Sequence, residues 1–283
     1  MKLQRTIVTV SVLLSLFLIG CLPKQTVKSP KPETQLNISV SIGPQAYFVT
    51  KITGKLATVQ SMIPSGADAH TFEPQPDKTI ELSKTDIYFT IGLDQEKAWI
   101  EKFKSINPKM AVSNSINQVS IKNGDPHVWL SPKYAKIISK NMYESIVQLD
   151  PANEETYTQN YSVWVMELDL LDQKIQKRLQ NTKNKTFLVY HPAWSYFADD
   201  YGLKMLSIEK EGKEPKPKEI ADIIQTAKEK NIHVLFYQPE KDQKLPQVIA
   251  NEINGKIQTI DPLASDWLIM MNTMTEMLYE VLR

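Results

Sequence analysis

Four residues with side chains that bind transition metals lie in predicted loops of this 283-residue chain. They are His70, His127, His191 and Asp261. Imidazole nitrogen and carboxylate oxygen suit Zn²⁺ and, with less preference, Mn²⁺. Long segments separate the four residues, and no two histidines stand one helical turn apart. A metal site of this composition therefore requires the fold to bring distant loops together.

Proline restricts the backbone at three of these positions. Pro126 precedes His127, while Pro192 and Pro262 follow His191 and Asp261. Proline fixes its own φ and biases the preceding residue toward extended conformations, so the backbone that carries these side chains is restricted. A lone histidine is more often structural than functional. The residues by themselves leave a metal site and a set of structural histidines equally open.

Short apolar strands that alternate with helices predict an α/β fold with parallel sheets and right-handed crossovers. The predicted strands cover residues 37–42, 57–63, 87–91, 186–190, 204–208, 232–237 and 256–260. His70, His191 and Asp261 follow strands, and ligands bind at that edge of open parallel sheets. His233 begins a strand and is expected to be structural.

One long helix is predicted after Asp150 and Pro151. Its apolar residues recur every three or four positions from Tyr157 to Leu179, without an intervening Gly or Pro. A helix of about 30 residues is about 45 Å long, which is enough to run across two lobes. We expect an N-terminal lobe at 36–150, a linking helix at 151–182 and a C-terminal lobe at 183–283. A site split between such lobes would open and close with their motion.

The N-terminus predicts export and lipidation. Lys2 and Arg5 precede an apolar run that ends at Gly20 and Cys21, as in a bacterial lipoprotein signal. We expect a signal peptide at 1–20, lipid on Cys21 that attaches the chain to a membrane, and a tether at 21–35. A signal anchor with an incidental cysteine is the alternative. Cys21 is the only cysteine, so metal ligands must be nitrogen and oxygen.

Several segments together resemble the zinc/manganese class of ABC-transporter solute-binding proteins (cluster A-I), over nearly the whole mature chain. The matching segments are Gly66–Pro74, Asp125–Pro132, Tyr190–Trp194, Ile260–Leu263 and the Asp150-Pro151 start of the long helix. The resemblance implies two lobes, each with a parallel sheet flanked by helices, and a metal site in the interlobe cleft. It also implies that His70, His127, His191 and Asp261 are the ligands. Histidine at 191, where manganese members often have glutamate, favours zinc.

The chain departs from that family pattern in two places. The loop at 113–123 has no histidine, although zinc members often carry a histidine-rich loop there. The usual Glu-Pro-Gln after the third strand of the C-terminal lobe is replaced by Gln238-Pro239-Glu240. These departures concern residues around the expected ligands rather than the ligands themselves.

The resemblance implies a monomeric, non-enzymatic receptor, lipid-anchored on the extracytoplasmic face of the cell membrane. It would capture zinc, with manganese as the second choice, and deliver it to an ABC permease and its ATPase. A manganese-specific receptor, a surface adhesin and a zinc hydrolase are the alternatives. A hydrolase needs an open coordination position for water, which Asp261 would fill. The formal net charge of +1 gives no basic surface for nucleic acid.

Overall fold

The structure is a computed structural model that describes residues 35–210, 215–239 and 242–283. The predicted signal peptide, Cys21 and nearly all of the tether therefore lie outside the described residues. Gln35–Arg283 form one compact unit. Within the described part of the chain, no helix has both the length and the apolar character to cross a membrane.

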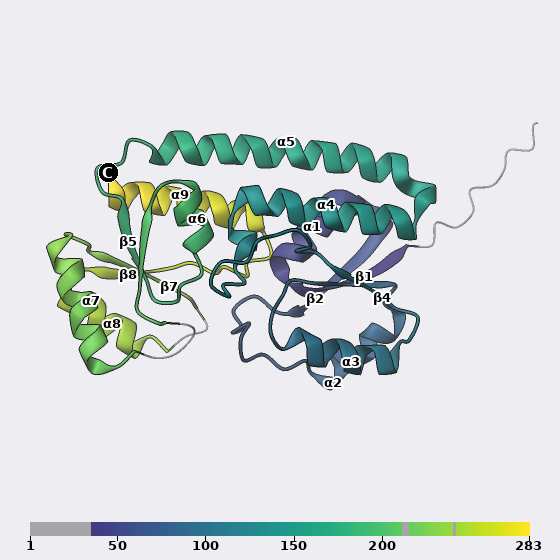
Figure 1. Cartoon of the computed structure of the whole chain (residues 1–283), viewed down its shortest axis with the longest axis horizontal. Helices are drawn as coiled ribbons and strands as arrows, with labels where there is room; N and C mark the ends of the chain where they lie inside the picture. Colours follow the sequence, from purple (N-terminus) through teal and green to yellow (C-terminus); the bar gives the residue numbers. More distant parts are fainter. Residues whose placement is uncertain (1–34, 211–214, 240–241) are drawn as a thin grey trace, which may run out of the picture. The chain divides into compact units, whose positions relative to one another are not determined.

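Two four-stranded parallel sheets confirm the predicted fold class (Figure 1). The first sheet has the order β2-β1-β3-β4 and the second the order β6-β5-β7-β8. The strands of the first sheet are β1 (Leu36–Ile42), β2 (Ala57–Ile63), β3 (Ile87–Thr90) and β4 (Ala111–Asn114). Those of the second are β5 (Thr186–Val189), β6 (Lys204–Ser207), β7 (Val234–Tyr237) and β8 (Lys256–Thr259). We call β1–α4 the N-terminal lobe and β5–α9 the C-terminal lobe.

Helices connect and cover the strands, as the crossovers of parallel strands require. The α-helices are α1 (Gly43–Thr53), α2 (Pro76–Glu81), α3 (Glu96–Ile106), α4 (Pro132–Leu149), α5 (Glu154–Leu179), α6 (Ser195–Asp200), α7 (Pro217–Glu229), α8 (Lys244–Glu252) and α9 (Trp267–Leu282). Short 3₁₀ turns are η1 (Gly54–Leu56), η2 (Leu82–Lys84), η3 (Val128–Leu130) and η4 (Pro151–Asn153). Proline at the first position of α4, after the Ser131 cap, explains why that helix begins there.

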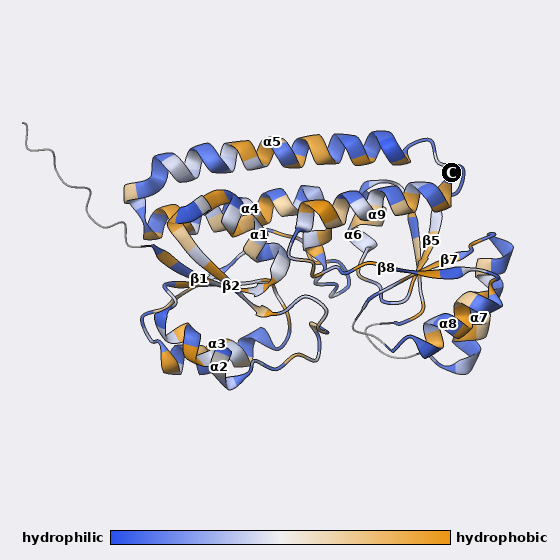
Figure 2. Cartoon of the chain, turned by 180° about the vertical axis from the view of Figure 1, so that it is seen from behind, coloured by the Kyte–Doolittle hydropathy of each residue, from blue (hydrophilic) through white to orange (hydrophobic). Residues whose placement is uncertain are grey.

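The long helix α5 is present but begins later than the sequence indicates. Residues 151–153 form the 3₁₀ turn η4, and the α-helix starts at Glu154. Asp150 accepts hydrogen bonds from Asn153 Nδ2 and the Tyr157 hydroxyl, both at 2.7 Å, which holds this corner instead of capping an α-helix directly. The predicted apolar face of α5 is buried except for the partly buried Tyr161, and the helix packs on α1, α4 and α9 (Figure 2).

A continuous apolar core joins the two lobes. It includes residues of the first sheet, α5, α9 and the second sheet. At its centre Phe48 of α1, Trp164 of α5 and Trp267 of α9 pack with ring centroids 5.1–5.9 Å apart. A separate, smaller cluster lies between the second sheet and helices α7 and α8. The lobes are thus parts of one packed body, with the ends of both sheets held at fixed positions.

Candidate metal centre

The three predicted histidine ligands lie on three loops. His70 follows β2, and its backbone N–H donates to Asp68 Oδ1 at 2.9 Å. His127 immediately precedes the buried turn η3, and its N–H donates to Asp125 Oδ1 at 3.0 Å. His191 lies two positions after the last residue of β5, in the other sheet. Local hydrogen bonds or a strand end therefore fix the backbone that carries each imidazole.

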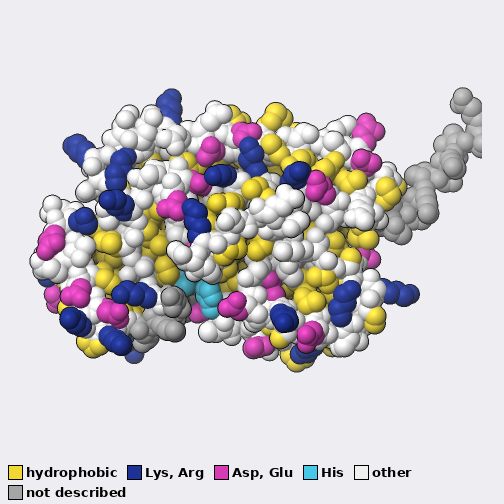
Figure 3. Space-filling view, viewed as in Figure 1, with side chains coloured by type: hydrophobic (Ala, Val, Ile, Leu, Met, Phe, Trp, Pro, Cys, Tyr) yellow, Lys and Arg dark blue, Asp and Glu magenta, His cyan; other side chains and the backbone are white. Residues whose placement is uncertain are grey.

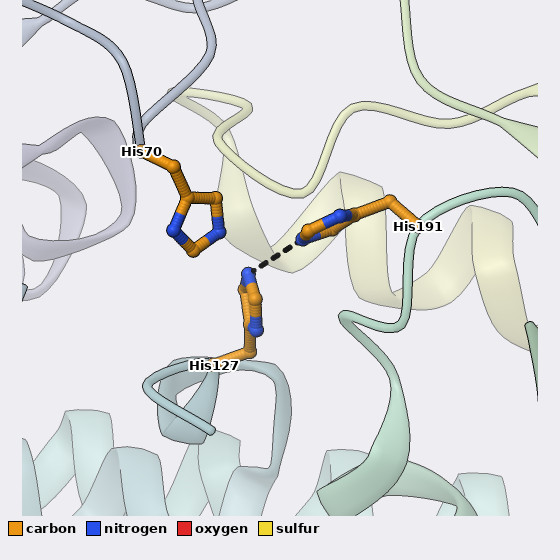
Figure 4. Close-up of side chains that lie close together, drawn as sticks. All are labelled: His70, His127 and His191. Atoms are coloured by element: carbon orange, nitrogen blue, oxygen red, sulfur yellow. Dashed lines mark hydrogen bonds between the residues drawn. The ribbon is translucent and has the colours of Figure 1, made fainter. Parts of the chain in front are cut away.

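The fold brings these three imidazoles together (Figure 4). Their potential ligand nitrogens all lie within 4.8 Å of one another. The ring centroids are 5.0 Å apart for His127 and His191, 5.2 Å for His70 and His191, and 5.5 Å for His70 and His127. His127 and His191 are buried, whereas His70 is exposed. The cluster is therefore reached from the side of His70.

Two carboxylates determine which nitrogen of each buried imidazole is available. His127 Nδ1 donates to Asp125 Oδ1 at 2.6 Å, and His191 Nδ1 donates to Glu209 Oε2 at 2.7 Å. In a neutral imidazole whose proton is on Nδ1, the Nε2 atom carries the lone pair. The two Nε2 atoms face each other 3.3 Å apart. Two nitrogens on a tetrahedral zinc, each bound at about 2.0–2.1 Å, are separated by about 3.3–3.4 Å. A cation between these lone pairs would satisfy both.

Burial and hydrogen bonding favour a neutral His127 beside an ionised Asp125. Burial lowers the pKa of His127 more than the neighbouring Asp125 raises it, which favours the neutral imidazole. For Asp125, burial raises the pKa, but hydrogen bonds from His127 and Ser195 outweigh it and lower the pKa overall. A neutral imidazole beside an ionised carboxylate is the pair that metal-binding histidines ordinarily use.

The structure does not bring Asp261 into the histidine cluster. The one set of described residues with metal-ligand spacing contains the three histidines alone. The half-buried Asp261 carboxylate instead accepts hydrogen bonds from the Ser65 hydroxyl and from the backbone N–H of Leu263, the latter at 2.8 Å. The fourth histidine, His233, lies apart, and its Nδ1 is 3.0 Å from the carbonyl oxygen of Ile253.

Two cavities adjoin the histidine cluster. The smaller, of about 20 Å³, is lined by all three histidines together with Ala67, Asp68, Ala69, Trp129, Gln238, Pro262 and Leu263. The larger, of about 540 Å³, lies against the same histidines and extends between the 92–94 and 122–126 loops and α6. Histidine side chains are visible at the surface in Figure 3. The site therefore has a confined side, formed largely by the 67–70 and 262–263 loops, and an open side.

The loops that carry His127 and Asp261 are joined by buried indole hydrogen bonds. Trp129 Nε1 donates to the Pro262 carbonyl oxygen at 2.9 Å, and Trp267 Nε1 donates to the Trp129 carbonyl oxygen at 2.8 Å. Because both bonds cross between the lobes, they fix the loop that carries His127 relative to the C-terminal lobe.

Sequence reasoning assigned no role to two residues of this site, Asp125 and Glu209. A usable signal existed for Glu209, because it follows β6, the strand paired with β5, and so emerges beside His191. Asp125 stands two residues before a predicted ligand, within reach of its ring. Gln238 belongs to the turn in which the chain departs from the family pattern, and the structure places it in the wall of the small cavity.

Comparison with known proteins gives one consistent family. Residues 38–281 match the family model described as zinc-uptake complex component A, periplasmic. A Chlamydia trachomatis protein, named as a candidate metal-binding protein, is 30% identical over 243 residues, which cover 82% of this chain and 87% of that protein. The high-affinity zinc uptake system protein ZnuA of Bacillus subtilis is 27% identical, over 81% of this chain and 79% of its own. A crystal structure of ZnuA superposes with a TM-score of 0.85 at 35% identity, over 88% of this chain and 100% of that one.

Proposed function

The chain belongs to the family of periplasmic zinc-uptake component A proteins, and we propose that it is the extracytoplasmic receptor of a metal importer. It captures a divalent transition metal, zinc in preference to manganese, and delivers it to the permease and ATPase of an ABC transporter. The names of the zinc-uptake relatives support this function. In this proposal the chain is a carrier and has no catalytic activity of its own.

The observation that carries the proposal is the pair of facing Nε2 atoms of His127 and His191. Their 3.3 Å separation fits two ligands of one tetrahedral zinc. The exposed His70 supplies the third nitrogen. Histidine and carboxylate donors without sulfur suit zinc and manganese, and three imidazoles favour zinc.

Zinc affinity measured by competition with a chromogenic chelator tests the proposed ligands. We expect one zinc per chain, and we expect His127→Ala to lose most of the affinity because one of three nitrogen ligands is gone. His233→Ala is the matched control, since His233 lies outside the cluster. Equal affinities for the wild-type chain and His127→Ala would contradict the assignment. The same titration with manganese decides the metal preference.

Asp261 remains a proposed fourth ligand. Its carboxylate would have to leave Ser65 and rotate toward the histidines when the metal binds. Asp261→Asn keeps the side-chain shape but removes the charge, so a fourth-ligand role predicts weaker zinc binding. Unchanged affinity in that variant would assign the fourth position to another oxygen ligand.

We also propose that Cys21 carries lipid, that residues 21–35 tether a monomer to the membrane, and that 36–150, 151–182 and 183–283 act as two lobes with a linking helix. The signal-like segment before Cys21 supports the anchor. Cys21→Ala should release the protein from the membrane fraction into the soluble fraction. Retention of this variant on the membrane would mean that a signal anchor holds the chain instead.

A further inference from the structure

Gln238 is a buried polar residue in the wall of the small cavity beside the histidines. It follows β7 directly, the residue is 6% exposed, and it lines the cavity with His70, His127 and His191. Its carboxamide can both donate and accept hydrogen bonds. A polar side chain in the wall of a cavity is placed to form a hydrogen bond with a group that enters the cavity.

The sheet places Gln238 between the strand that leads to His191 and the strand that leads to Asp261. In the second sheet β7 lies between β5, which leads to His191, and β8, which leads to Asp261. Tyr237 pairs with Thr259, and the Ile260 N–H donates to the Tyr237 carbonyl oxygen at 2.9 Å. Gln238 and Asp261 therefore leave the same sheet edge on adjacent strands.

The coordination chemistry of zinc calls for one more ligand at this place. Three imidazoles leave one position of a tetrahedron open. A cavity of about 20 Å³ has room for about one water molecule. A carboxamide can accept a hydrogen bond from a metal-bound water, or donate one to the carboxylate of Asp261. Asp68, another polar residue of the cavity wall, already accepts the N–H of His70.

We propose that Gln238 is a further residue of the metal site, and that its carboxamide hydrogen-bonds the oxygen ligand that completes the coordination of the metal. This inference rests on the proposed zinc-binding function. Gln238 thus contributes to affinity and to the choice of metal through the fourth ligand, without replacing any histidine.

The test compares Gln238→Leu with the wild-type chain in two measurements. Removal of a residue that orients a metal ligand typically costs about 10- to 100-fold in metal affinity, so we expect zinc affinity to fall by at least about 10-fold. We also expect the visible absorption bands of the Co²⁺-loaded variant to change, because these bands report the coordination geometry. A residue that only fills space would leave the Co²⁺ bands unchanged.

Gln258→Leu is the matched control. Gln258 lies on the neighbouring strand β8, is half-buried and has the same carboxamide, but it is not part of the cavity wall. Zinc affinity and Co²⁺ bands should match the wild type in this variant. Gln238→Glu serves as the rescue, because it restores an oxygen acceptor and adds negative charge near the cation.

Each outcome separates this inference from the proposed function. A wild-type chain that binds no zinc would overturn both. Zinc binding that is lost in His127→Ala but unchanged in Gln238→Leu, with unchanged Co²⁺ bands, would overturn the role of Gln238 alone. Weak binding in Gln238→Glu, no better than in Gln238→Leu, would also contradict it. Equal melting temperatures of the variants and the wild-type chain, measured without metal, exclude misfolding as the cause of a loss.

Discussion

At the scale of single residues, the site depends on the carboxylates behind the imidazoles as much as on the imidazoles themselves. Asp125 and Glu209 hold the protons on Nδ1 of His127 and His191, so that both Nε2 lone pairs point at one place. Glu209 is 3% exposed, and a carboxylate this deeply buried requires partners of this kind. Asp125 also binds helix α6, because its other oxygen accepts a hydrogen bond from Ser195.

Glu209→Gln isolates the effect of a carboxylate on its histidine. We expect zinc affinity to fall by about 10- to 100-fold, because the amide neither fixes the tautomer nor raises the basicity of the ligand as a carboxylate does. Glu276→Gln on α9 is the control, since Glu276 pairs with Arg178 away from the site. The measurement is chelator competition at neutral pH, and identical zinc affinity in Glu209→Gln and Glu276→Gln would contradict the role of Glu209.

At the scale of elements, the sequence predicts the strands that lead to the site better than it predicts where the side chains of the site lie. Apolar runs and periodicity identify the strands that lead to His70, His191 and Asp261, and these strands are confirmed within one or two residues. Whether a side chain at a strand end turns inward depends on contacts from distant segments. Ser65 holds the Asp261 carboxylate outside the cluster, and Glu209 reaches His191 from another strand. Neither pairing has a local sequence pattern.

Helix α9 links the lobes through Trp267, which packs on Phe48 and Trp164 and donates to the Trp129 carbonyl oxygen. We expect Trp267→Ala to lower the free energy of unfolding by about 3–5 kcal/mol, as for other large core truncations. Ile269→Ala, on the same helix but 64% exposed, should change it by less than about 0.5 kcal/mol. Urea denaturation of the metal-free proteins measures the free energy of unfolding of both variants. Similar unfolding midpoints for the two variants would contradict the role of Trp267 in the interlobe core.

At the scale of the whole described unit, the shared core limits how far the lobes can separate. The sequence suggests a site that opens and closes by lobe motion. In the structure, α5 and α9 pack into a core common to both lobes, and two buried indole hydrogen bonds cross between them. Separation of the lobes would expose this apolar surface, which opposes a wide opening. Metal exchange is therefore expected to use loop and side-chain motion around the exposed His70.

Small-angle X-ray scattering of the chain with and without zinc tests this expectation. The radius of gyration should be the same in both states within experimental error, because closure of a wide cleft is not needed to assemble the site. A clear decrease on addition of zinc, reversed by a chelator, would instead support large lobe motion.

The central claim is that His70, His127 and His191 bind one metal ion through nitrogen. X-ray absorption at the zinc edge of the zinc-loaded protein tests it directly, because the fine structure counts and identifies the ligands. The account predicts three imidazole nitrogens at about 2.0–2.1 Å, one oxygen completing a tetrahedron, and no sulfur. A shell of five or six oxygens, or a first shell with fewer than two imidazoles, would contradict it.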